Sequence, residues 1–423
     1  MRKSKLQLIG LNFLEFAVWG TYQISMGTYL AHIGFGEQIG LFYAIQGIVA
    51  LLMPTLVGGI ADYCLPAQRV LGICHGISAL SMLAVGYYGW VSGENVSFMW
   101  LFGGYTIGVA FYLPTIGLSY SVAYTIFDQV GMDLVKYYPP IRVFGPVGFI
   151  VSMCLVDLLG FQDSPLQFLC CGIIGLLMAF YSFALPDCPV RASSGNTIGS
   201  LFVKMGTTAL SMFRRREMCL FLVFSMLTGA SLQITNGFGN PYLTNFSRIP
   251  EYAETFGVRH ANLLISLSQI SETCCLLLIP YFFRRLGIKR VMQVAMLAWV
   301  LRFALFAAGN PGDRVWMFVL SMVVYGMAFD FFNVSGSLYV NMETDPSLRS
   351  SAQGVFLMMT IGVGCTVGML GAQAVVNHFV DFGSIDAQVI EWKYAWWCFS
   401  AYALVVLLLF SLLFHPKKPA KLV

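Results

Sequence analysis

The chain has 423 residues, of which 58% are hydrophobic and only 10% are charged, and its mean hydropathy is +0.75. Soluble domains carry roughly 25% charged residues, so this composition excludes an ordinary soluble domain and indicates a membrane protein. The basic residues behind the net charge of +4 are dispersed over many segments and form no single stripe. We therefore expect no nucleic-acid partner.

Apolar stretches of about 20 residues, the length that crosses a bilayer core, recur along the whole chain. We predict twelve membrane-spanning helices at residues 8–30, 38–60, 70–90, 98–123, 142–160, 165–185, 218–240, 261–282, 289–309, 315–340, 352–376 and 394–414. The first stretch is too long and too rich in polar residues for a cleaved signal peptide, so we expect it to remain as a helix.

Lys and Arg residues set the expected orientation, because cytoplasmic loops retain positive charge. With the N-terminus inside, eighteen of the 24 basic residues fall in internal segments and four in external loops, while Arg142 and Arg302 lie within or at the edge of predicted helices. We therefore expect both termini in the cytoplasm.

The cysteines and histidines show no pattern of a metal or disulfide site. Most of the eleven Cys, including the adjacent Cys170 and Cys171, lie in predicted helices, and the five His are scattered. A membrane-embedded enzyme would need a nucleophile with a base, paired carboxylates or a metal cluster, and we find no such set. We expect no metal, no cofactor and no enzymatic activity.

The predicted helices fall into two groups of six. The least apolar long connection, 186–217, separates an N-terminal bundle at 1–185 from a C-terminal bundle at 218–423. Such a pairing is typical of secondary transporters, whose substrate site lies near the bilayer midplane. Residues 58–62 (GGIAD), followed by Arg69, are placed in the turn after the second predicted helix and resemble the GxxxD loop signature of the major facilitator superfamily.

Ionisable residues inside the predicted helices are the strongest functional signal, because each costs about 2.5 to 3.5 kcal/mol at a helix centre on insertion scales. They are Glu15, Arg142, Glu272, Arg302 and Asp330. Asp330 lies deepest in its helix, where an unpaired carboxyl group is expected to hold its proton until water or a cation reaches it. This makes Asp330 a candidate proton carrier. The alternative is a structural ion pair between Asp330 and an arginine, and Arg302 fits either a carboxylate partner or a polar pocket.

Polar and aromatic side chains accompany these charges at helical spacing. Gln233 and Asn236 are three residues apart, as are Gln269 and Glu272, so each pair shares a helix face. Tyr325 and Phe329 form an aromatic strip beside Asp330. Amides suit a hydroxyl-rich ligand and the rings suit a planar base, which favours nucleosides. The alternatives are interhelical hydrogen bonding for the amide pairs and simple packing for the rings.

Several longer segments carry a more specific resemblance. They are PPIRVFGPVGFI (139–150), FSMLTGASLQITNGFGNPYL (224–243), SQISETCCLLLIPYFFRRLGIKRVM (268–292), AWVLRFALFAAGNP (298–311), VYGMAFDFFNVSGSLYV (324–340) and RSSAQGVFLMM (349–359), with FLEFAVWG (13–20) and YLPTIGL (112–118) in the N-terminal half. Together they are similar to the bacterial nucleoside:proton symporter family of the major facilitator superfamily.

The resemblance implies roles for individual residues. The positions that line the substrate cavity in this family correspond to Arg142, Phe149, Gln233, Asn236, Gln269, Tyr325 and Phe329, and those that couple the proton to Glu272 and Asp330. Two positions depart from the family pattern. Pro146 replaces a usual Thr, which removes a hydroxyl and a backbone donor and predicts a kink. Glu15 replaces a usual Gln and adds a titrating group.

We therefore expect an all-α membrane protein of the major facilitator fold, a monomer in the bacterial cytoplasmic membrane that imports nucleosides with protons by alternating access. A major facilitator transporter for a sugar or a drug shares most of these features and is the main alternative. A channel is a weaker one, because polar pairs spread over several helices suit an occluding site better.

Overall fold

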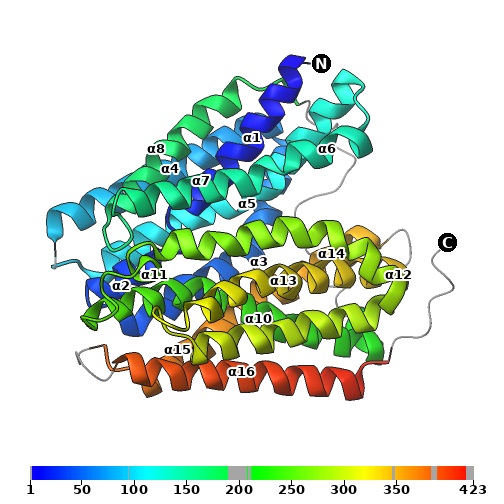
Figure 1. Ribbon diagram of the computed structural model, residues 1–423. Coiled ribbons are helices and arrows are strands. Elements are labelled where there is room, and N and C mark those ends of the chain that lie inside the picture. Colours follow the sequence, from blue (N-terminus) through cyan, green and yellow to red (C-terminus); the bar gives the residue numbers. More distant parts are fainter. Residues whose placement is uncertain are drawn as a thin grey trace. The chain divides into compact units, whose positions relative to one another are not determined.

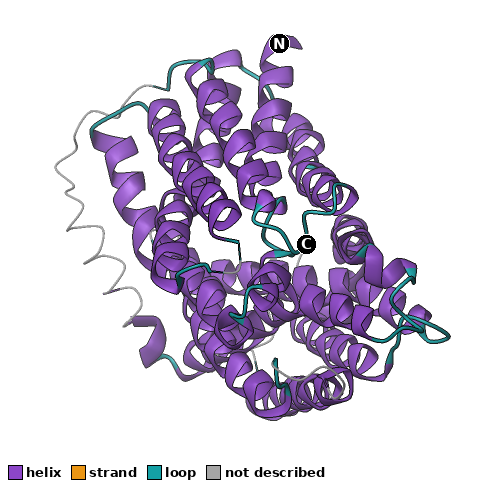
Figure 2. Cartoon of the chain, turned by 90° about the vertical axis from the view of Figure 1, so that its left-hand side faces the viewer, coloured by secondary structure: helices purple, strands orange, loops and turns teal. Residues whose placement is uncertain are grey.

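The structure is a computed structural model of the chain, and it describes residues 2–93, 95–188, 207, 211–344, 348–382 and 388–415. Every regular element of these residues is helical, as labelled in Figure 1 and coloured purple in Figure 2. The chain divides into two compact units. The first contains residues 1–201 and 236–241, and the second contains residues 202–235 and 242–423.

The first unit is built from the N-terminal helices. Within it α1 lies beside α7, and α4 lies between α5 and α8. Its elements are α1 (Arg2–Gly20), α2 (Met26–His32), η1 (Gly36–Gln38), α3 (Ile39–Tyr63), α4 (Ala67–Ser92), α5 (Phe98–Val130), α6 (Leu134–Arg142), α7 (Phe144–Leu158) and α8 (Leu166–Phe183).

The first predicted helix, 8–30, is interrupted. α1 ends at Gly20, residues 21–25 form turns, and α2 begins at Met26. In the interruption Thr21 Oγ1 donates to the Val18 carbonyl oxygen at 2.7 Å, and Ser25 Oγ donates to Gln167 Oε1 at 3.0 Å. Such side-chain bonds compete with helical ones and bend or open a helix. The prediction of one continuous helix is therefore wrong at residues 21–25.

The fifth predicted helix, 142–160, also begins differently. α6 ends at Arg142, and α7 starts at Phe144 after a break at Val143. Pro146 lies in the first turn of α7, where a backbone N–H has no intrahelical acceptor and its loss costs little. The chain thus breaks before Pro146 instead of kinking at it. The backbone of residues 58–62 forms the last turns of α3. Their predicted place in the turn after this helix is therefore wrong.

The second unit contains the C-terminal helices, and α12 packs along both α13 and α16. Its elements are α10 (Arg216–Asn245, apart from 236–241), η2 (Phe246–Arg248), α11 (Phe256–Arg259), α12 (Ala261–Ala308), α13 (Val315–Glu343), α14 (Arg349–Leu357), the π-helical η3 (Met358–Val363), α15 (Gly364–Phe379) and α16 (Gln388–Leu413). Of the predicted connection 186–217, only residues 186–188, 207 and 211–217 are described.

α12 spans two predicted helices, 261–282 and 289–309. The chain turns between them at Gly287, whose φ of 75° and ψ of 166° are not helical. This positive φ is open to glycine and strained for other residues, so Gly287 separates two helical stretches within α12. The predicted division between these two helices is confirmed.

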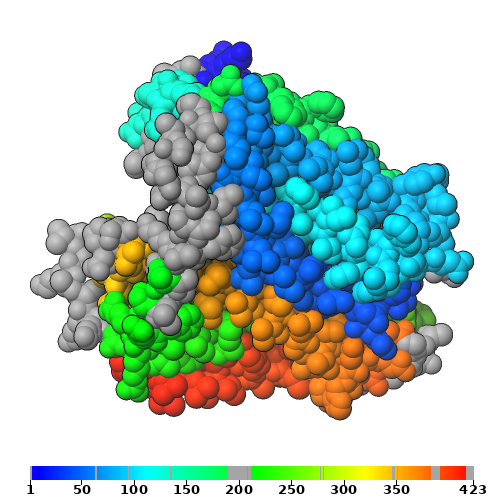
Figure 3. All heavy atoms as spheres, turned by 180° about the vertical axis from the view of Figure 1, so that it is seen from behind, coloured from blue at the N-terminus to red at the C-terminus, as the bar shows by residue number. Residues whose placement is uncertain are grey.

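Aromatic side chains stack within the core of the second unit, and apolar side chains are exposed on its outside. Phe221 of α10 stacks on Phe356 of α14 with ring centroids 5.6 Å apart, and both are buried. α15 (orange) and α16 (red) lie at the surface of this unit in Figure 3. Leu408 and Leu412 of α16 are 52% and 70% exposed. Exposed leucines along a helix are expected where lipid replaces water.

Ten helices of the described residues are long and apolar enough to cross a membrane. The predicted spans 8–30 and 261–282 are not among them, although both regions are helical in α1 and α12. α1 carries three basic residues in its first turn and Glu15 further along, and the first part of α12 carries Gln269 and Glu272. Both regions therefore contain an acidic residue of the predicted site, Glu15 in α1 and Glu272 in α12.

Candidate functional site

α12 and α13 bring six of the predicted site residues together. Gln269, Glu272 and Arg302 come from α12, and Tyr325, Phe329 and Asp330 come from α13. The rings of Tyr325 and Phe329 are nearly parallel, with an interplanar angle of 11° and centroids 6.2 Å apart. Both residues lie on one side of α13 because they are four positions apart, as the sequence predicts.

Tyr325 is the centre of this cluster, and it is buried. Its hydroxyl group is hydrogen-bonded with Gln269 across the two helices. The Arg302 guanidinium lies over its ring, 4.5 Å from the centroid, and Trp299 contacts the ring edge-on at 5.9 Å. These contacts hold the Tyr325 ring in one orientation.

Asp330 has a buried carboxyl group that lacks an ion-pair partner among the described residues. The side chain is 5% exposed, no salt bridge involves it in the described part of the chain, and its Oδ2 atom has no hydrogen-bond partner there. Glu272 lies close enough to interact with it electrostatically. Two carboxyl groups that repel each other in an apolar environment do not both ionise readily. The pair can therefore bind a proton and release it when the surroundings change.

Arg302 settles one of the alternatives that the sequence leaves open. It is 3% exposed, and its Nη1 donates to the Ser321 carbonyl oxygen at 2.8 Å and to Ser268 Oγ at 3.3 Å. No carboxylate pairs with it among the residues described. Arg302 thus occupies an aromatic and hydroxyl-lined pocket, and the structural ion pair between it and Asp330 is absent from the described structure.

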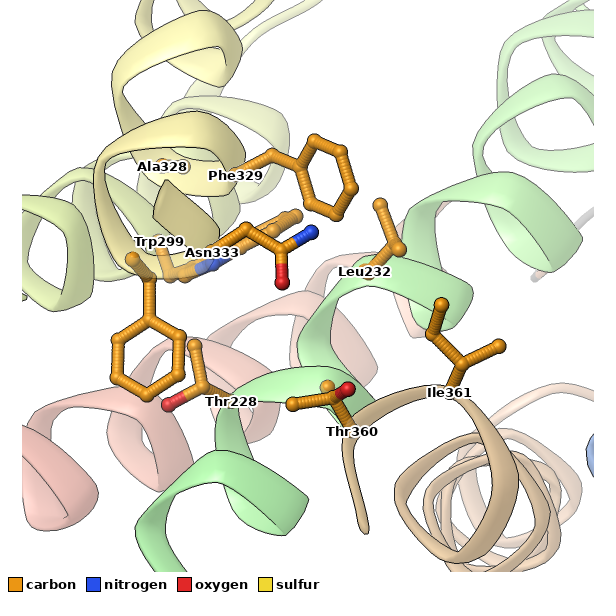
Figure 4. Close-up of a pocket in the computed structure, with 10 residues that line it drawn as sticks. Thr228, Leu232, Trp299, Ala328, Phe329, Asn333, Thr360 and Ile361 are labelled. Carbon is orange, nitrogen blue, oxygen red and sulfur yellow. The ribbon is translucent and has the colours of Figure 1, made fainter. Parts of the chain in front are cut away.

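A small cavity adjoins this cluster (Figure 4), and its volume is about 20 Å³, room for one water molecule. Phe329 and Asn333 extend from α13 toward Thr228 and Leu232 of α10 and Thr360 of η3. Trp299 also lines the cavity, and its buried Nε1 has no hydrogen-bond partner in the described structure. The cavity is too small for a nucleoside but large enough for one substituent of a base.

The polar residues that line this cavity are not among those predicted from the sequence. Thr228, Trp299, Asn333 and Thr360 are all uncharged, and only Asn333 had a local signal, because it follows Phe329 by four positions and Asp330 by three. Such spacing places Asn333 on the same side of α13. For the other three, nothing in the sequence shows which helices face one another.

Gln233 and Asn236 of α10 lie apart from this cavity. Gln233 is 5% exposed and Asn236 is half-buried, and neither lines the cavity, which α10 borders through Thr228, Gly229 and Leu232. Asn236 belongs to the short segment of α10 that groups with the first unit. Their predicted role as substrate contacts therefore remains a prediction.

The remaining predicted residues belong to the first unit. Arg142 donates to the Tyr120 hydroxyl oxygen and lies over the rings of Phe16 and Tyr120, 4.7 and 4.8 Å from their centroids. Phe149 is 7% exposed and meets the Trp19 ring at right angles, with centroids 6.1 Å apart. Glu15 is fully buried and pairs with His75 at 2.9 Å.

Comparison with known proteins adds to this geometry. The family model described as nucleoside H⁺ symporter matches residues 2–419. The chain belongs to the nucleoside H⁺ symporter family. This agrees with the resemblance carried by the PPIR, LQITN, SQISE and AFDF segments.

Family members with 40% identity match the chain along nearly all of its length. The nucleoside permease NupG of Escherichia coli (strain K12) is 40% identical over 416 residues, which are 98% of this chain and 96% of the relative. The xanthosine permease of the same organism is 41% identical over 408 residues, or 96% and 94% of the two chains. These relatives are permeases, so this symporter chain is a transporter and not an enzyme.

Solved structures show the same fold. A crystal structure of the nucleoside transporter NupG matches with a TM-score of 0.87 and 39% identity, over 98% of this chain and all 100% of that one. An auto inhibited POT family peptide transporter matches with a TM-score of 0.71 at 13% identity, over 99% of this chain and 98% of that chain, which shows the fold alone. The symporter chain therefore has the major facilitator fold that its sequence predicts.

Proposed function

We propose that this symporter imports nucleosides together with protons across the bacterial cytoplasmic membrane by alternating access. The observation that carries the proposal is the cluster on α12 and α13, in which the parallel rings of Tyr325 and Phe329 adjoin an amide and two interacting carboxyl groups. Planar bases stack on such rings, and buried carboxyl groups exchange protons. Family membership and the relatives' names favour nucleosides over the alternative of a sugar or a drug.

Each predicted residue has a proposed task. The base stacks near Tyr325 and Phe329, and the ribose hydroxyls bind Gln233, Asn236 and Gln269. Asp330 and Glu272 hold the coupling proton. Arg142 and Phe149 are proposed substrate contacts on the strength of the family resemblance.

The proton supplies enough free energy for uphill import. A neutral nucleoside that enters with one proton moves one charge, worth about 2.3 kcal/mol per 100 mV. Since about 1.4 kcal/mol corresponds to a tenfold ratio, a potential of 100 mV supports roughly fortyfold accumulation. One proton per nucleoside thus supplies enough free energy for accumulation inside the cell.

The proposed topology follows the distribution of charges along the sequence. Both termini lie in the cytoplasm, twelve helices cross the membrane, and the chain works as a monomer. The proposed transport bundles are residues 1–185 and 218–423, joined by the cytoplasmic segment 186–217. The excess of Lys and Arg in the predicted internal segments supports this orientation.

Counterflow in proteoliposomes tests the proposal most directly. Vesicles that contain the full chain are loaded with unlabelled uridine, and entry of labelled uridine is followed while uridine, adenosine, xanthosine or glucose competes from outside. We expect labelled uridine to enter faster than into protein-free vesicles, to be recovered chemically unchanged, and to be displaced by nucleosides but not by glucose. Failure of uridine and adenosine to compete would support the sugar or drug alternative.

A further inference from the structure

The first unit contains a second buried pair of titratable groups, which the proposed mechanism does not use. Glu15 of α1 and His75 of α4 are both 0% exposed, and His75 Nε2 lies 2.9 Å from Glu15 Oε2. The other carboxyl oxygen, Oε1, accepts a hydrogen bond from Thr115 Oγ1 of α5 at 2.6 Å. Tyr112 of the same helix donates to the Glu15 carbonyl oxygen at 2.9 Å. Three helices therefore converge on one carboxyl group.

The net charge of the pair depends on one exchangeable proton. A carboxylate beside a neutral imidazole, which has a single N–H, carries one net negative charge. One added proton makes the pair neutral, whether it lies on the carboxyl group or on the imidazole. Burial of an uncompensated charge is unfavourable. His75 Nδ1 is buried and has no hydrogen-bond partner within the described residues. Within the described residues, the protein thus fixes the Nε2 atom of His75 and gives its Nδ1 atom no hydrogen-bond partner.

The surroundings of the pair contain few groups that compensate its charge. Besides His75, titratable groups that interact with Glu15 include Cys74 of α4 and Tyr112 and Tyr120 of α5. On α8, Cys171 interacts with Tyr112. The contacts of α1 with α7 near Glu15 involve Phe13 with Gly148, Phe16 with Gly145 and Trp19 with Phe149, none of which titrates. None of these neighbours is a cation that neutralises Glu15.

Arg142 of α6 is a cation on the same side of the first unit, and its side chain contacts other groups. Its guanidinium donates to the Tyr120 hydroxyl oxygen and lies over the ring of Phe16, the residue after Glu15, but forms no ion pair with Glu15 in the described structure. Tyr120 interacts electrostatically with both Arg142 and Glu15. Tyr120 therefore lies between Arg142, a proposed substrate contact, and the Glu15–His75 pair. A substrate that displaces the Arg142 side chain would change the electrostatic potential at the pair.

We propose that the Glu15–His75 pair is a second proton-binding site of the transport cycle, so that two protons enter with each nucleoside. The inference rests on the proposed function of nucleoside import. The second proton is taken from water outside the cell onto the carboxyl–imidazole pair and is released to water in the cytoplasm, with no other bond made or broken. At 100 mV, the second charge raises the limiting accumulation from roughly fortyfold to its square, roughly 1,600-fold.

A reversal-potential experiment counts the charges. Full-length protein is reconstituted in vesicles with a tenfold outward uridine gradient and equal pH on both sides, and the potential that stops net uridine flux is found. One charge per uridine requires about 60 mV and two charges require about 30 mV. We expect about 30 mV for the wild type and about 60 mV for Glu15→Gln and for His75→Gln. Ser119→Ala, which removes a buried hydroxyl one turn further along α5 that bonds only its own helix, serves as the matched control and keeps the wild-type value.

The outcomes separate this inference from the proposed function. A wild-type value near 60 mV overturns the second proton site without reference to any variant, so the test does not depend on how well the variants fold. Values near 30 mV in the wild type and in either folded variant also overturn it, because the pair then carries no transported proton. Absence of saturable uridine flux in the wild type overturns nucleoside import itself.

Discussion

The Arg302 guanidinium lies 4.5 Å from the centroid of the Tyr325 ring and stabilises that ring without a carboxylate partner among the described residues. The ring is in turn hydrogen-bonded with Gln269. A buried cation therefore orients an aromatic residue that is proposed to stack on the base. Because an arginine plane matches a ring face and an ammonium group does not, the exchange of Arg302 for lysine tests this relationship.

We expect Arg302→Lys to destabilise the protein by about 2 kcal/mol, the value of a desolvated cation–π contact. Arg285→Lys is the matched control, because Arg285 of the same helix lies 4.9 Å from the Tyr281 ring at an exposed position, where the contact is worth about 0.5–1 kcal/mol. Thermal unfolding of the purified variants measures both. Equal losses of stability in the two variants would contradict a special role for Arg302.

Asp330→Asn tests the proposed coupling proton. The amide has nearly the shape of the carboxyl group but does not exchange a proton, so we expect uphill uridine uptake driven by an acidic exterior to fall to the level that the proton of the Glu15–His75 pair supports alone. Counterflow, which needs no net proton movement, should remain. Asp128→Asn at an exposed position of α5 is the control and should keep both activities. Full accumulation by the Asp330→Asn variant would reject Asp330 as the coupling residue.

The cluster on α12 and α13 was predictable from the sequence for a local reason. Gln269 and Glu272 are three positions apart and Tyr325 and Phe329 are four apart, and helical geometry alone places each pair on one face. The cost of a charge in lipid then singles out Asp330 and Glu272. No contact between distant helices is needed for either step.

Contacts between helices were not predictable in the same way. Glu15 and His75 are sixty positions apart, and whether they meet depends on how α1 and α4 are rotated about their axes. The same holds for Trp299 of α12 and Thr360 of η3, which line one cavity. The break at residues 21–25 was missed because hydropathy averaged over a helix length does not register a few local hydrogen bonds such as that of Thr21.

The cavity beside Phe329 predicts residues that distinguish bases. If a substituent of the base enters the cavity, Asn333→Ala should remove one hydrogen bond, worth about 1 kcal/mol. The affinity for nucleosides that carry this substituent should then fall roughly fivefold relative to the affinity for the others. Trp299→Phe should act in the same direction, because Trp299 lines the cavity and its buried Nε1 has no hydrogen-bond partner among the described residues. Trp396→Phe is the control, since the Nε1 of Trp396 is likewise without a partner in the described structure but Trp396 does not line the cavity.

Competition by a panel of nucleosides in the counterflow assay measures this effect. The ratio of inhibition constants between two nucleosides is the informative quantity, since a general loss of affinity changes all constants equally. An equal change of all inhibition constants in the Asn333→Ala and Trp299→Phe variants would show that these residues do not distinguish one base from another.

α12 and α13 pack closely at Gly326, so a larger residue at this position should destabilise the protein. A Cβ atom at Gly326 would lie 2.5 Å from the Ser271 carbonyl oxygen and 2.8 Å from the Glu272 backbone nitrogen. These are backbone atoms, so Gly326→Ala must push the helices apart, at a cost of typically 1–3 kcal/mol. Gly371→Ala on α15, where nothing lies within 4 Å of the added atom, is the control. Alanine is preferred over glycine in a helix by about 0.5–1 kcal/mol, so the control should keep or gain stability.

Because Gly326 adjoins Tyr325, the Gly326→Ala variant should also lose uridine counterflow in proportion to its lower unfolding temperature. An unchanged unfolding temperature in Gly326→Ala would show that α12 and α13 are not held at this distance.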